Sequence, residues 1–588
     1  METIKDLGTY TLTAMLENSV AKFAERPAVA YVGEEPITYA EMGRRIARFR
    51  DLLHSAGVDK GQRVVLFGPS SPSWGIAYFS IVSLGAVAVP LLPDFSAKEA
   101  DACIRHSGAE TLVIATKLAD KIPDPAALGI TRVFRLDDLE LLVGGIVRDA
   151  GESARTAREE DTASIIYTSG TTGRSKGVEL SHKNLAFTAI GGQFFQRINK
   201  FDVGLSILPM SHVYEFTIGF LMFFLNGACV YYLDKPPAVT TLLPALAKVR
   251  PTIMLSVPII MEKIYKNKIV PTFTSKPLVA KLYGMPLFRV LFHRLAGKSL
   301  RRTFGGRIKF FGIGGAKVDP VVERFLKEAR FPYAIGYGLT ETSPLLAGSG
   351  PSITVPGTIG PAMPGVELKI ADPDPATGIG EVVARGPNVM KGYYRDPELT
   401  ATVIDKDGWL RTGDLGAMDE KGRLGLKGRS KNMILGASGE NIYPEDIEFV
   451  LNQHPFVAES LVVEGEHSSL VALVQIDEEK VAREAGLRAE RAAAHEARPD
   501  MGQQLHAMGE AVGDAMHGAM NGMGQALQYK REEIMNEIKF FVNENVNRMS
   551  RIDRVELIDS FEKTASQKIK RYLYSIKKSL SGGSRGNA

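Results

Sequence analysis

The chain has 588 residues, 45% of them apolar and 23% charged, a composition typical of a soluble globular protein with a large core. Its 71 basic and 67 acidic residues leave a net charge of +4, which gives no indication of a nucleic-acid partner. Two cysteines, Cys103 and Cys229, are too few for a disulfide framework or a metal knuckle and favour a reducing cytoplasm. The first ten residues are charged and lack a long apolar run, so we expect no secretory signal there.

Helix-like and strand-like patterns alternate from the start of the chain to about residue 345. Helical periodicity predicts a helix over 40–57, a short strand follows at 62–68, and 73–91 reads as a buried helix leading into a strand. A further helix is predicted at 97–108 and a strand at 111–116. Such alternation is typical of an α/β fold, in which parallel sheets carry helices on their faces.

The most apolar stretch of the chain, residues 216–233, is long enough to invite a membrane-spanning interpretation. Asn226-Gly227 interrupts it with a turn signal. We therefore expect a buried helix, a turn and a short strand.

The sequence pattern changes several times in the second half of the chain. Residues 307–315 predict a strand that ends in glycines, and the helix after it, 319–330, has Asp319 as N-cap and Pro320 at its first position. Glycine and proline become frequent from about 353 to 425, which indicates a compact β subdomain with strands such as 366–371 and 380–386. A smaller α+β part follows beyond 430, with strands at 461–465 and 470–476.

Two segments near the C-terminus stand apart from this pattern. Residues 478–535 are strongly helical and rich in Met and Gly, which predicts a helical hairpin inserted between two strands; a docking surface for a partner or a membrane is the alternative. From Lys568 to the end there are six Lys/Arg and no Asp or Glu. This basic tail either touches anionic lipid or is simply solvated.

The stretch "YTSGTTGRSKGVELSH" (167–182) combines hydroxyls, glycines and a lysine. Glycines let the backbone approach a phosphate, hydroxyls and amides donate hydrogen bonds, and lysine adds a positive charge. A predicted strand, 163–167, precedes it, so the loop lies at a strand end, where α/β sheets usually bind ligands. The glycine and lysine spacing excludes a Walker A loop. The residues predict a phosphate loop, with a flexible surface turn as the alternative.

This loop closely resembles the phosphate-loop signature of the adenylate-forming superfamily of acyl-CoA synthetases, peptide-synthetase adenylation domains and luciferases. Four more motifs follow in that family's order: "GYGLTETSP" (336–344), "GWLRTGDLG" (408–416), "GRSKNMILGASGENIYPEDIE" (428–448) and "KTASQKIKR" (563–571). The resemblance implies a large adenylation domain at 1–428, made of two parallel-sheet α/β subdomains and a small β-barrel-like subdomain at about 350–427. It further implies a hinge at 429–431 and a mobile α+β lid domain at 432–588, which carries the insertion 478–535 and the basic tail 572–588.

The resemblance also implies roles for individual residues. The β- and γ-phosphates of ATP would be held by Thr168, Ser169, Gly170, Thr171, Thr172 and Lys176. The adenosine part would be bound by Gly314, Gly315, Ala316, Tyr337, Asp414 and Arg429. Glu341, with Thr168, would hold Mg²⁺, which usually takes one or two carboxylates plus phosphate oxygens. Thr340 would contact the α-phosphate, and Lys568 would stabilise the charge that develops as pyrophosphate leaves.

Three further residues receive roles from the same resemblance. His212 matches a position near the acyl entrance, although a hydrogen-bonded wall histidine is an equal alternative. Lys431 falls at the hinge, and Gly439 resembles the glycine beside the thiol channel.

The implied reaction activates a carboxylate with Mg-ATP to an acyl-adenylate and then transfers the acyl group to coenzyme A. The segments 208–236 and 439–448 resemble the long-chain fatty acyl-CoA synthetase branch, so a fatty acid of medium to long chain is the expected substrate. Alternatives are transfer to an acyl carrier protein, activation of an aryl or amino acid, and a non-catalytic binding protein on the same scaffold. Peripheral membrane contact is a further hypothesis, and the oligomeric state stays open, with a homodimer compatible.

Overall fold

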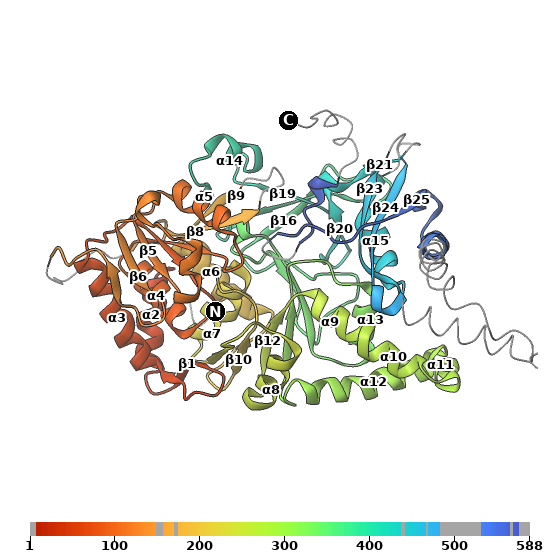
Figure 1. The fold of residues 1–588 in the computed structure, drawn as a ribbon, viewed down its shortest axis with the longest axis horizontal. Coiled ribbons are helices and arrows are strands. Elements are labelled where there is room, and N and C mark those ends of the chain that lie inside the picture. The colour runs from red at the N-terminus through yellow and green to blue at the C-terminus, as the bar shows by residue number, and fades with distance from the viewer. Residues whose placement is uncertain are drawn as a thin grey trace, which may run out of the picture. The chain divides into compact units, whose positions relative to one another are not determined.

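Short apolar strands and capped helices alternate through the first 340 residues, as the sequence pattern predicts. The computed structural model describes residues 7–148, 157–169, 175–436, 441–465, 469–481, 531–564 and 568–574. The chain divides into two compact units, Met1–Leu426 and Lys427–Ala588. Figure 1 traces the elements of both.

The first sheet of the large unit has eight strands. In sheet order they are β15 (Ala347–Gly348), β14 (Tyr333–Tyr337), β13 (Phe310–Ile313), β12 (Ile253–Ser256), β10 (Val203–Ser206), β11 (Cys229–Tyr232), β1 (Pro27–Tyr31) and β2 (Ile37–Thr38). The six central strands pair in parallel, whereas β15 and β2 close the two edges in antiparallel orientation.

The second sheet also has eight strands. Their order is β18 (Gly392–Tyr393), β9 (Ser175–Ser181), β8 (Thr162–Ser169), β4 (Val87–Leu91), β3 (Arg63–Phe67), β5 (Thr111–Ile114), β6 (Arg132–Arg135) and β7 (Leu141–Val143). Strands β8 to β6 pair in parallel, and β9, β18 and β7 are antiparallel to their neighbours. Two mostly parallel sheets with helices between and outside them confirm the predicted α/β class.

Helix α4 (Pro72–Ser83) shows how the two sheets share one core. It contacts β1 of the first sheet and β3 and β4 of the second, and its residues from Trp74 to Val82 are all buried. Ser71 caps this helix by accepting the amide of Trp74, and Pro72 supplies the helical φ of its first turn. A helix that is apolar all round is therefore explained by its place between two sheets.

The remaining helices of the large unit have the following bounds. They are α2 (Leu12–Lys22), α3 (Tyr39–Ser55), α5 (Ala97–Ser107), α6 (His182–Gly191), α7 (Met222–Leu225), α8 (Val239–Val249), α9 (Pro258–Ile264), α10 (Val270–Thr274), α11 (Pro277–Tyr283), α12 (Pro286–Thr303), α13 (Pro320–Glu328) and α14 (Pro397–Val403). Two π-helical segments, η4 (Glu215–Leu221) and η5 (Tyr265–Ile269), and the 3-10 turns η1 (Thr116–Lys121), η2 (Ala126–Leu128), η3 (Gly192–Phe194) and η6 (Thr340–Thr342) complete the set.

Local sequence signals predicted several of these boundaries correctly. The predicted helix at 40–57 is α3, which ends just before Gly57 in the left-handed region at φ 89°. Asp319 caps α13 by accepting the amides of Val321 and Val322, with Pro320 at the first position. The apolar stretch 216–233 forms a buried helical segment, a turn at Asn226-Gly227 and strand β11, as expected. Among the described residues, no helix combines the length and apolarity needed to cross a bilayer.

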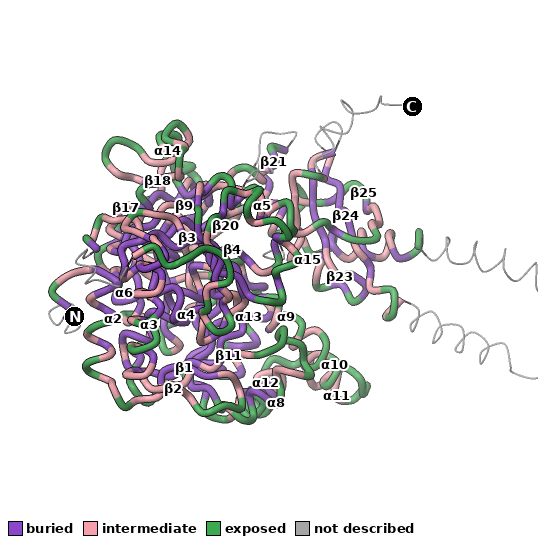
Figure 2. The backbone as a smooth tube through the Cα atoms, turned by 60° about the vertical axis from the view of Figure 1, so that its left-hand side comes forward, coloured by how far each residue is buried: buried purple, intermediate pink, exposed green. Residues whose placement is uncertain are grey.

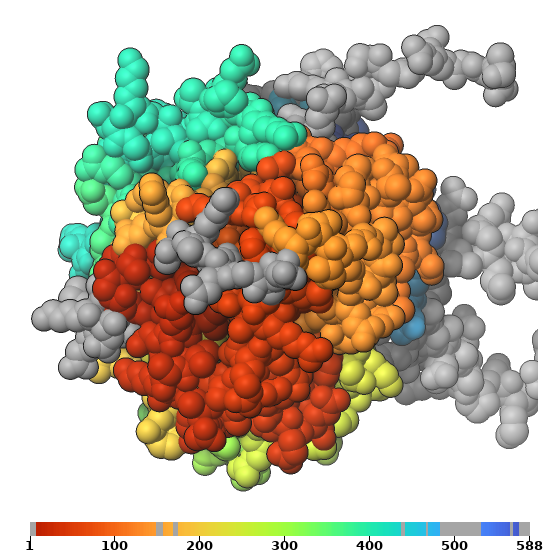
Figure 3. Space-filling model, turned by 90° about the vertical axis from the view of Figure 1, so that its left-hand side faces the viewer, coloured from red at the N-terminus to blue at the C-terminus, as the bar shows by residue number. Residues whose placement is uncertain are grey.

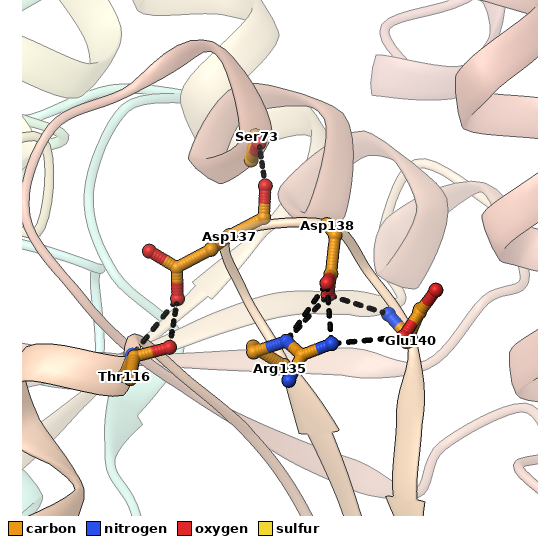
Figure 4. A network of polar contacts seen from close by, with 6 residues as sticks. All are labelled: Ser73, Thr116, Arg135, Asp137, Asp138 and Glu140. Carbon is orange, nitrogen blue, oxygen red and sulfur yellow. Dashed lines mark hydrogen bonds and ion pairs between the residues drawn. The ribbon is translucent and has the colours of Figure 1, made fainter.

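A turn between β6 and β7 closes one edge of the second sheet (Figure 4). Asp137 accepts the backbone amide and the hydroxyl of Thr116, both at 2.8 Å, and its carbonyl accepts the hydroxyl of Ser73. Arg135 donates to Asp138 and Glu140 across the turn. Because the guanidinium of Arg135 donates to the Asp138 carboxylate, the pKa of that carboxyl is lowered. The exposed cluster fixes the hairpin.

A third, four-stranded sheet contains β16 (Glu367–Ala371), β17 (Gly380–Arg385), β19 (Leu410–Met418) and β20 (Leu424–Arg429). Strand β17 pairs antiparallel with both β16 and β19. Figure 3 shows one face of the molecule, where the N-terminal part of the chain, in red and orange, lies below the blue-green surface of residues from about 370 to 410.

The second unit is a small α+β structure. Its strands are β21 (Ile434–Leu435), β22 (Asn441–Ile442), β23 (Val457–Glu464), β24 (Leu470–Ile476) and β25 (Arg554–Leu557), and its helical elements include η7 (Ser430–Asn432), α15 (Pro444–Gln453), η9 (Arg548–Ser550) and η10 (Arg571–Leu573). The middle strand β24 pairs antiparallel with β23 and parallel with β25. Most of the predicted insertion, residues 482–530, and residues 575–588 of the basic tail lie outside the described residues.

Candidate active site

The predicted phosphate loop connects two paired strands, β8 and β9. Their antiparallel register places Thr168 opposite Lys176, directly beside the loop. Strand β8 also pairs in parallel with β4, so the loop leaves the sheet from an interior strand. Gly170, Thr171 and Thr172 lie outside the described residues, and Ser169 is described only as the last residue of β8.

A tyrosine links this loop to the predicted metal carboxylate. Lys176 Nζ lies 5.0 Å from the ring centroid of Tyr393, and the hydroxyl of Tyr393 donates to Glu341 Oε1 at 2.9 Å. Tyr393 reaches this position because β18 pairs with β9, opposite Val178. A cation over an aromatic face and a hydroxyl on a carboxylate both stabilise the arrangement. The structure thus brings Lys176 and Glu341 to the two sides of one residue that sequence reasoning missed.

Hydrogen bonds from Asn388 hold the turn that carries Thr340 and Glu341. The buried amide of Asn388 donates to the carbonyls of Thr342 at 3.2 Å and Leu345 at 2.7 Å, and the carbonyl of Asn388 accepts the hydroxyl of Ser343. The amide of Met390 donates to the carbonyl of Glu341 itself. The carboxylate and its neighbour Thr340 are therefore positioned by backbone anchoring on both sides.

Gly338, at the start of this turn, has a steric reason to be glycine. A Cβ placed on it would lie 1.7 Å from the carbonyl oxygen of Pro344, so no other residue fits without moving the turn. The glycine that flanks the "LTETSP" residues is thus needed to fold the turn back on itself.

Tyr337 and Asp414 form a second buried pair. The hydroxyl of Tyr337 donates to Asp414 Oδ2 at 2.7 Å, and each residue is 7% exposed. Tyr337 is the last residue of β14, and Asp414 lies on β19, where the amide of Asp414 donates to Thr412 Oγ1. The tyrosine ring offers a face on which a base can stack, and the carboxylate can accept hydrogen bonds from sugar hydroxyls. Together they suit a nucleoside.

The glycines after β13 contact another aromatic ring. A Cβ on Gly314 would lie 3.1–3.4 Å from the ring atoms of Tyr214, and Gly315 adopts a left-handed φ of 84°. Close packing against Tyr214 therefore explains part of this glycine pattern without a ligand. Ala316 continues the same turn, and its backbone stays a candidate for the adenine pocket.

An apolar cavity of about 50 Å³ lies beside these groups. Its wall combines Tyr214, Ile218, Met222 and Phe223 from the π-helix and α7 with residues of β12, β13 and β14, among them Leu255 and Ala334. Strand β14 runs from this wall to Tyr337, and β13 runs to Gly314. The cavity thus lies along the strands whose ends carry the nucleoside candidates. His212, half-buried, comes two residues before Tyr214, at the start of the same segment.

A buried acid, Glu215, lies behind the cavity wall. Burial raises the pKa of Glu215 to about 8, so the carboxyl is neutral at pH 7. Its Oε2 has no hydrogen-bond partner among the described residues. The side chain fills the space over Gly219, where a Cβ would lie 2.8 Å from the carboxyl carbon. Glu215 begins the π-helical segment η4, and such π-helical turns are rare and occur frequently at functional sites.

The remaining predicted residues belong to the second unit. Arg429 ends β20, and Lys431 lies exposed in η7. Lys568 is exposed, its amide donates to Thr564 Oγ1, and its carbonyl accepts the amide of Thr564. Gly439 and residues 565–567 lie outside the described residues.

Ion pairs hold the segments on both sides of Lys568. Lys563 pairs with Glu459 at 2.7 Å, and Arg571 donates two hydrogen bonds to the carboxylate of Glu448. Both acids belong to the body of the second unit, so the segments before and after Lys568 are anchored to it. None of these anchoring residues was predicted, because such contacts join positions about 100 residues apart in the chain.

Comparison with known proteins identifies the scaffold. Residues 16–394 match the family described as AMP-binding enzyme. The long-chain-fatty-acid–CoA ligase FadD15 of Mycobacterium bovis is 33% identical over 75% of this chain and 78% of its own. The peroxisomal long chain acyl-CoA synthetase 6 of Arabidopsis thaliana is 31% identical over 75% of this chain and 68% of its own.

Solved structures agree on the fold. ATP-bound MatB from Rhodopseudomonas palustris superposes with a TM-score of 0.71 at 23% identity, covering 96% of this chain and 98% of that one. The match spans both units, and the family match covers the phosphate loop, the Glu341 turn and Tyr393. The chain therefore belongs to the AMP-binding enzyme family.

Proposed function

We propose that this protein is an AMP-forming acid–thiol ligase that converts a fatty acid of medium to long chain into its coenzyme A thioester. The observation that carries the proposal is the group Lys176–Tyr393–Glu341 next to the Tyr337–Asp414 pair, with an apolar cavity along the same strands. Relatives named long-chain-fatty-acid–CoA ligases support the choice of acid and thiol.

In the first half-reaction, a carboxylate oxygen of the fatty acid attacks the α-phosphorus of ATP. The bond from the α-phosphorus to the bridging oxygen breaks, pyrophosphate leaves, and an acyl-adenylate forms. Lys176 and the loop hydroxyls of Thr168, Ser169, Thr171 and Thr172, with the backbone at Gly170, bind the leaving pyrophosphate. Thr340 orients the α-phosphate, so catalysis is mainly positioning and charge stabilisation.

Mg²⁺ would be held by Glu341, with Thr168 as a second ligand. Among the described residues no cluster of three His, Cys, Asp or Glu side chains could hold a metal alone. A single carboxylate suits Mg²⁺, which completes its shell with phosphate oxygens and water. Bound Mg²⁺ would neutralise charge on the phosphates, and Tyr393 holds Glu341 in place for it.

The nucleoside binds just after β13, at the end of β14 and at the middle of β19. Tyr337 offers its ring to adenine, with the backbone of Gly314, Gly315 and Ala316 as the opposite wall. Asp414 and Arg429 bind the ribose hydroxyls, since a carboxylate accepts two hydroxyl donors well. The hydrogen bond from Tyr337 fixes one carboxylate oxygen of Asp414 before ribose arrives.

The second unit supplies a different group to each half-reaction. Lys568 stabilises the charge on the α-phosphate during adenylation. The unit then turns about Lys431, which removes Lys568 and brings the segment of Gly439 to the thiol channel. The sulfur of coenzyme A attacks the acyl carbonyl, the bond to the phosphate oxygen breaks, and AMP leaves. Closure excludes water that would hydrolyse the adenylate.

The acyl chain would occupy the apolar cavity, and His212, two residues before the wall residue Tyr214, stays a candidate for its entrance. At about 50 Å³ the cavity is small for a long chain, so binding requires side chains such as Phe223 to move. Protein location follows from the substrate: we propose a cytoplasmic enzyme in peripheral contact with the inner face of a membrane.

The test of this function is product formation. The purified protein is given ATP, Mg²⁺ and acids from two to twenty carbons, with coenzyme A or acyl carrier protein as acceptor. We expect acyl-CoA and AMP in equal amounts, with a maximum at medium to long chains. Transfer to carrier protein but not to coenzyme A would mean that carrier protein is the acceptor. If no acid gave AMP, the proposal would be overturned and a non-catalytic binding protein would be favoured.

A further inference from the structure

The connection between β12 and β13 is strongly basic. From Lys263 to Lys309 it contains twelve Lys/Arg and no Asp or Glu. It is a helical excursion of α9, η5, α10, α11 and α12, and ten of its basic residues are exposed. The net charge of the whole chain is only +4, so this concentration is local.

Exposed leucines accompany the charges on helix α12. Leu287, Leu291 and Leu295 recur every four residues and are 82%, 51% and 53% exposed. Arg294, Lys298, Arg301 and Arg302 lie on the same side, because at 100° per residue all seven positions fall within one third of the helix circumference. Leu278 on α11 and Met285 before α12 add to the apolar part. Figure 2 shows the exposed colour along α11 and α12.

The opposite side of α12 already has its partners within the large unit. His293 Nε2 lies 2.8 Å from the hydroxyl of Tyr283, and its Nδ1 lies 2.7 Å from Glu328 of α13. Arg289 adds two hydrogen bonds to Glu328, and Phe292 stacks on Phe273 at 5.1 Å. The helix is therefore held in place by its inner side, and the leucines of the outer side contribute little to folding.

A row of exposed leucines next to a row of basic residues matches a bilayer surface. Apolar side chains enter the boundary between headgroups and acyl chains, while Lys and Arg remain among anionic phosphates. Nucleic acid would use the charges but leave the leucines in water, and a protein partner of neutral charge would leave the charges unpaired. The combination of basic and apolar side chains thus favours a bilayer surface as the partner.

We propose that the outer side of α11 and α12, the α12 surface defined by Leu278, Leu287, Leu291, Leu295, Arg294, Lys298, Arg301 and Arg302, docks on a membrane that contains anionic phospholipid. The proposal gives the peripheral contact proposed above a described surface, distinct from the basic tail. It does not depend on the ligase reaction. The excursion begins after β12 and ends at β13, two strands of the cavity wall.

The test is vesicle co-sedimentation of the full chain at about 0.1 M salt, where charge interactions reach about 10 Å. Vesicles are pure phosphatidylcholine or phosphatidylcholine with about 30% phosphatidylglycerol. One variant carries Leu287→Ser, Leu291→Ser and Leu295→Ser; another carries Arg294→Gln, Lys298→Gln, Arg301→Gln and Arg302→Gln. Matched controls change exposed residues elsewhere: Leu142→Ser, Ile146→Ser and Ile353→Ser together, and Lys98→Gln, Lys117→Gln, Lys235→Gln and Lys406→Gln together.

We expect the wild type to bind the anionic vesicles and each α12 variant to bind at least about tenfold more weakly, because each basic residue near the surface strengthens binding severalfold. The controls should bind like the wild type, and all variants should activate a short water-soluble acid at the wild-type rate. Wild-type affinity in both α12 variants would overturn the proposal, as would loss of binding only on removal of 575–588. Loss in the arginine variant alone would indicate a general polyanion site and also contradict it.

Discussion

At the scale of single residues, Tyr393 carries the most weight in the proposed site. Its ring lies beside Lys176 and its hydroxyl donates to Glu341, so one side chain joins the proposed phosphate loop to the carboxylate proposed to bind Mg²⁺. The motifs alone named Lys176 and Glu341 but gave no reason for their relative position.

Replacing Tyr393 with phenylalanine separates the two contacts. The ring over Lys176 remains, but the hydrogen bond to the carboxylate is lost, and a hydrogen bond to a charged group contributes about 1.5–3 kcal/mol. We expect kcat/KM for adenylation to fall on the order of tenfold, with a higher Mg²⁺ requirement. Pyrophosphate exchange over a Mg²⁺ series measures both. The neighbour Tyr394→Phe is the control, and an equal loss there would argue against the assigned contact.

The raised pKa of Glu215 leads us to expect that the stability of the folded chain depends on pH. Its pKa in the folded chain is about 8, above the ordinary 4.5, so the native state binds a proton that the unfolded state releases. The folded state is therefore destabilised as pH rises from about 4.5 to about 8. Glu215→Gln imitates the neutral acid and removes this dependence.

Thermal unfolding of wild type and Glu215→Gln at pH 5, 6.5 and 8 tests this directly. The variant should gain stability relative to wild type as pH rises, since other titrating groups contribute equally to both proteins. A constant difference across the three pH values would mean that Glu215 keeps an ordinary pKa.

At the scale of elements, the turn around Glu341 depends on a residue from a distant strand connection. Asn388 donates to two turn carbonyls and its own carbonyl accepts Ser343. Sequence signals could not reveal this, because asparagine in "GPNVMKG" looks like an ordinary turn former. The local signals that did succeed, such as Asp319-Pro320 for α13, act within one turn of the chain.

Asn388→Ala should therefore loosen the turn and lower both stability and adenylation. Leaving two buried carbonyls unpaired costs about 1–3 kcal/mol each. Calorimetry should show a lower unfolding midpoint, and pyrophosphate exchange a higher KM for ATP. Arg135→Ala, in the exposed network of Figure 4, removes several hydrogen bonds at the surface and should change neither quantity appreciably. Equal effects of the two variants would contradict the anchoring role.

At the scale of the whole molecule, order of motifs and alternation of elements were enough to predict two mostly parallel sheets and a smaller α+β part. They could not predict which side chains meet, since Tyr393 joins the predicted phosphate loop through pairing of β18 with β9. The apolar cavity is likewise lined by residues of seven elements, η3, η4, α7, β12, β13, β14 and β15. No motif predicted this cavity, in which we propose that the acid is selected.

The division into two units suggests that a single substitution can impair one half-reaction and leave the other intact. Lys568→Ala should lower fatty acid-dependent pyrophosphate exchange by roughly a hundredfold or more, because a charge-stabilising group is removed from the first step only. Thioester formation from supplied acyl-adenylate and coenzyme A should stay near the wild-type rate. Equal loss of both activities would contradict the division of labour between the units.

The central claim, that this chain adenylates a fatty acid, is tested most directly by exchange of labelled pyrophosphate into ATP without any thiol present. The account predicts exchange that requires a medium- or long-chain fatty acid and Mg²⁺, and that falls sharply in Glu341→Gln. Exchange that is absent with every fatty acid, or equally fast without one, would contradict it.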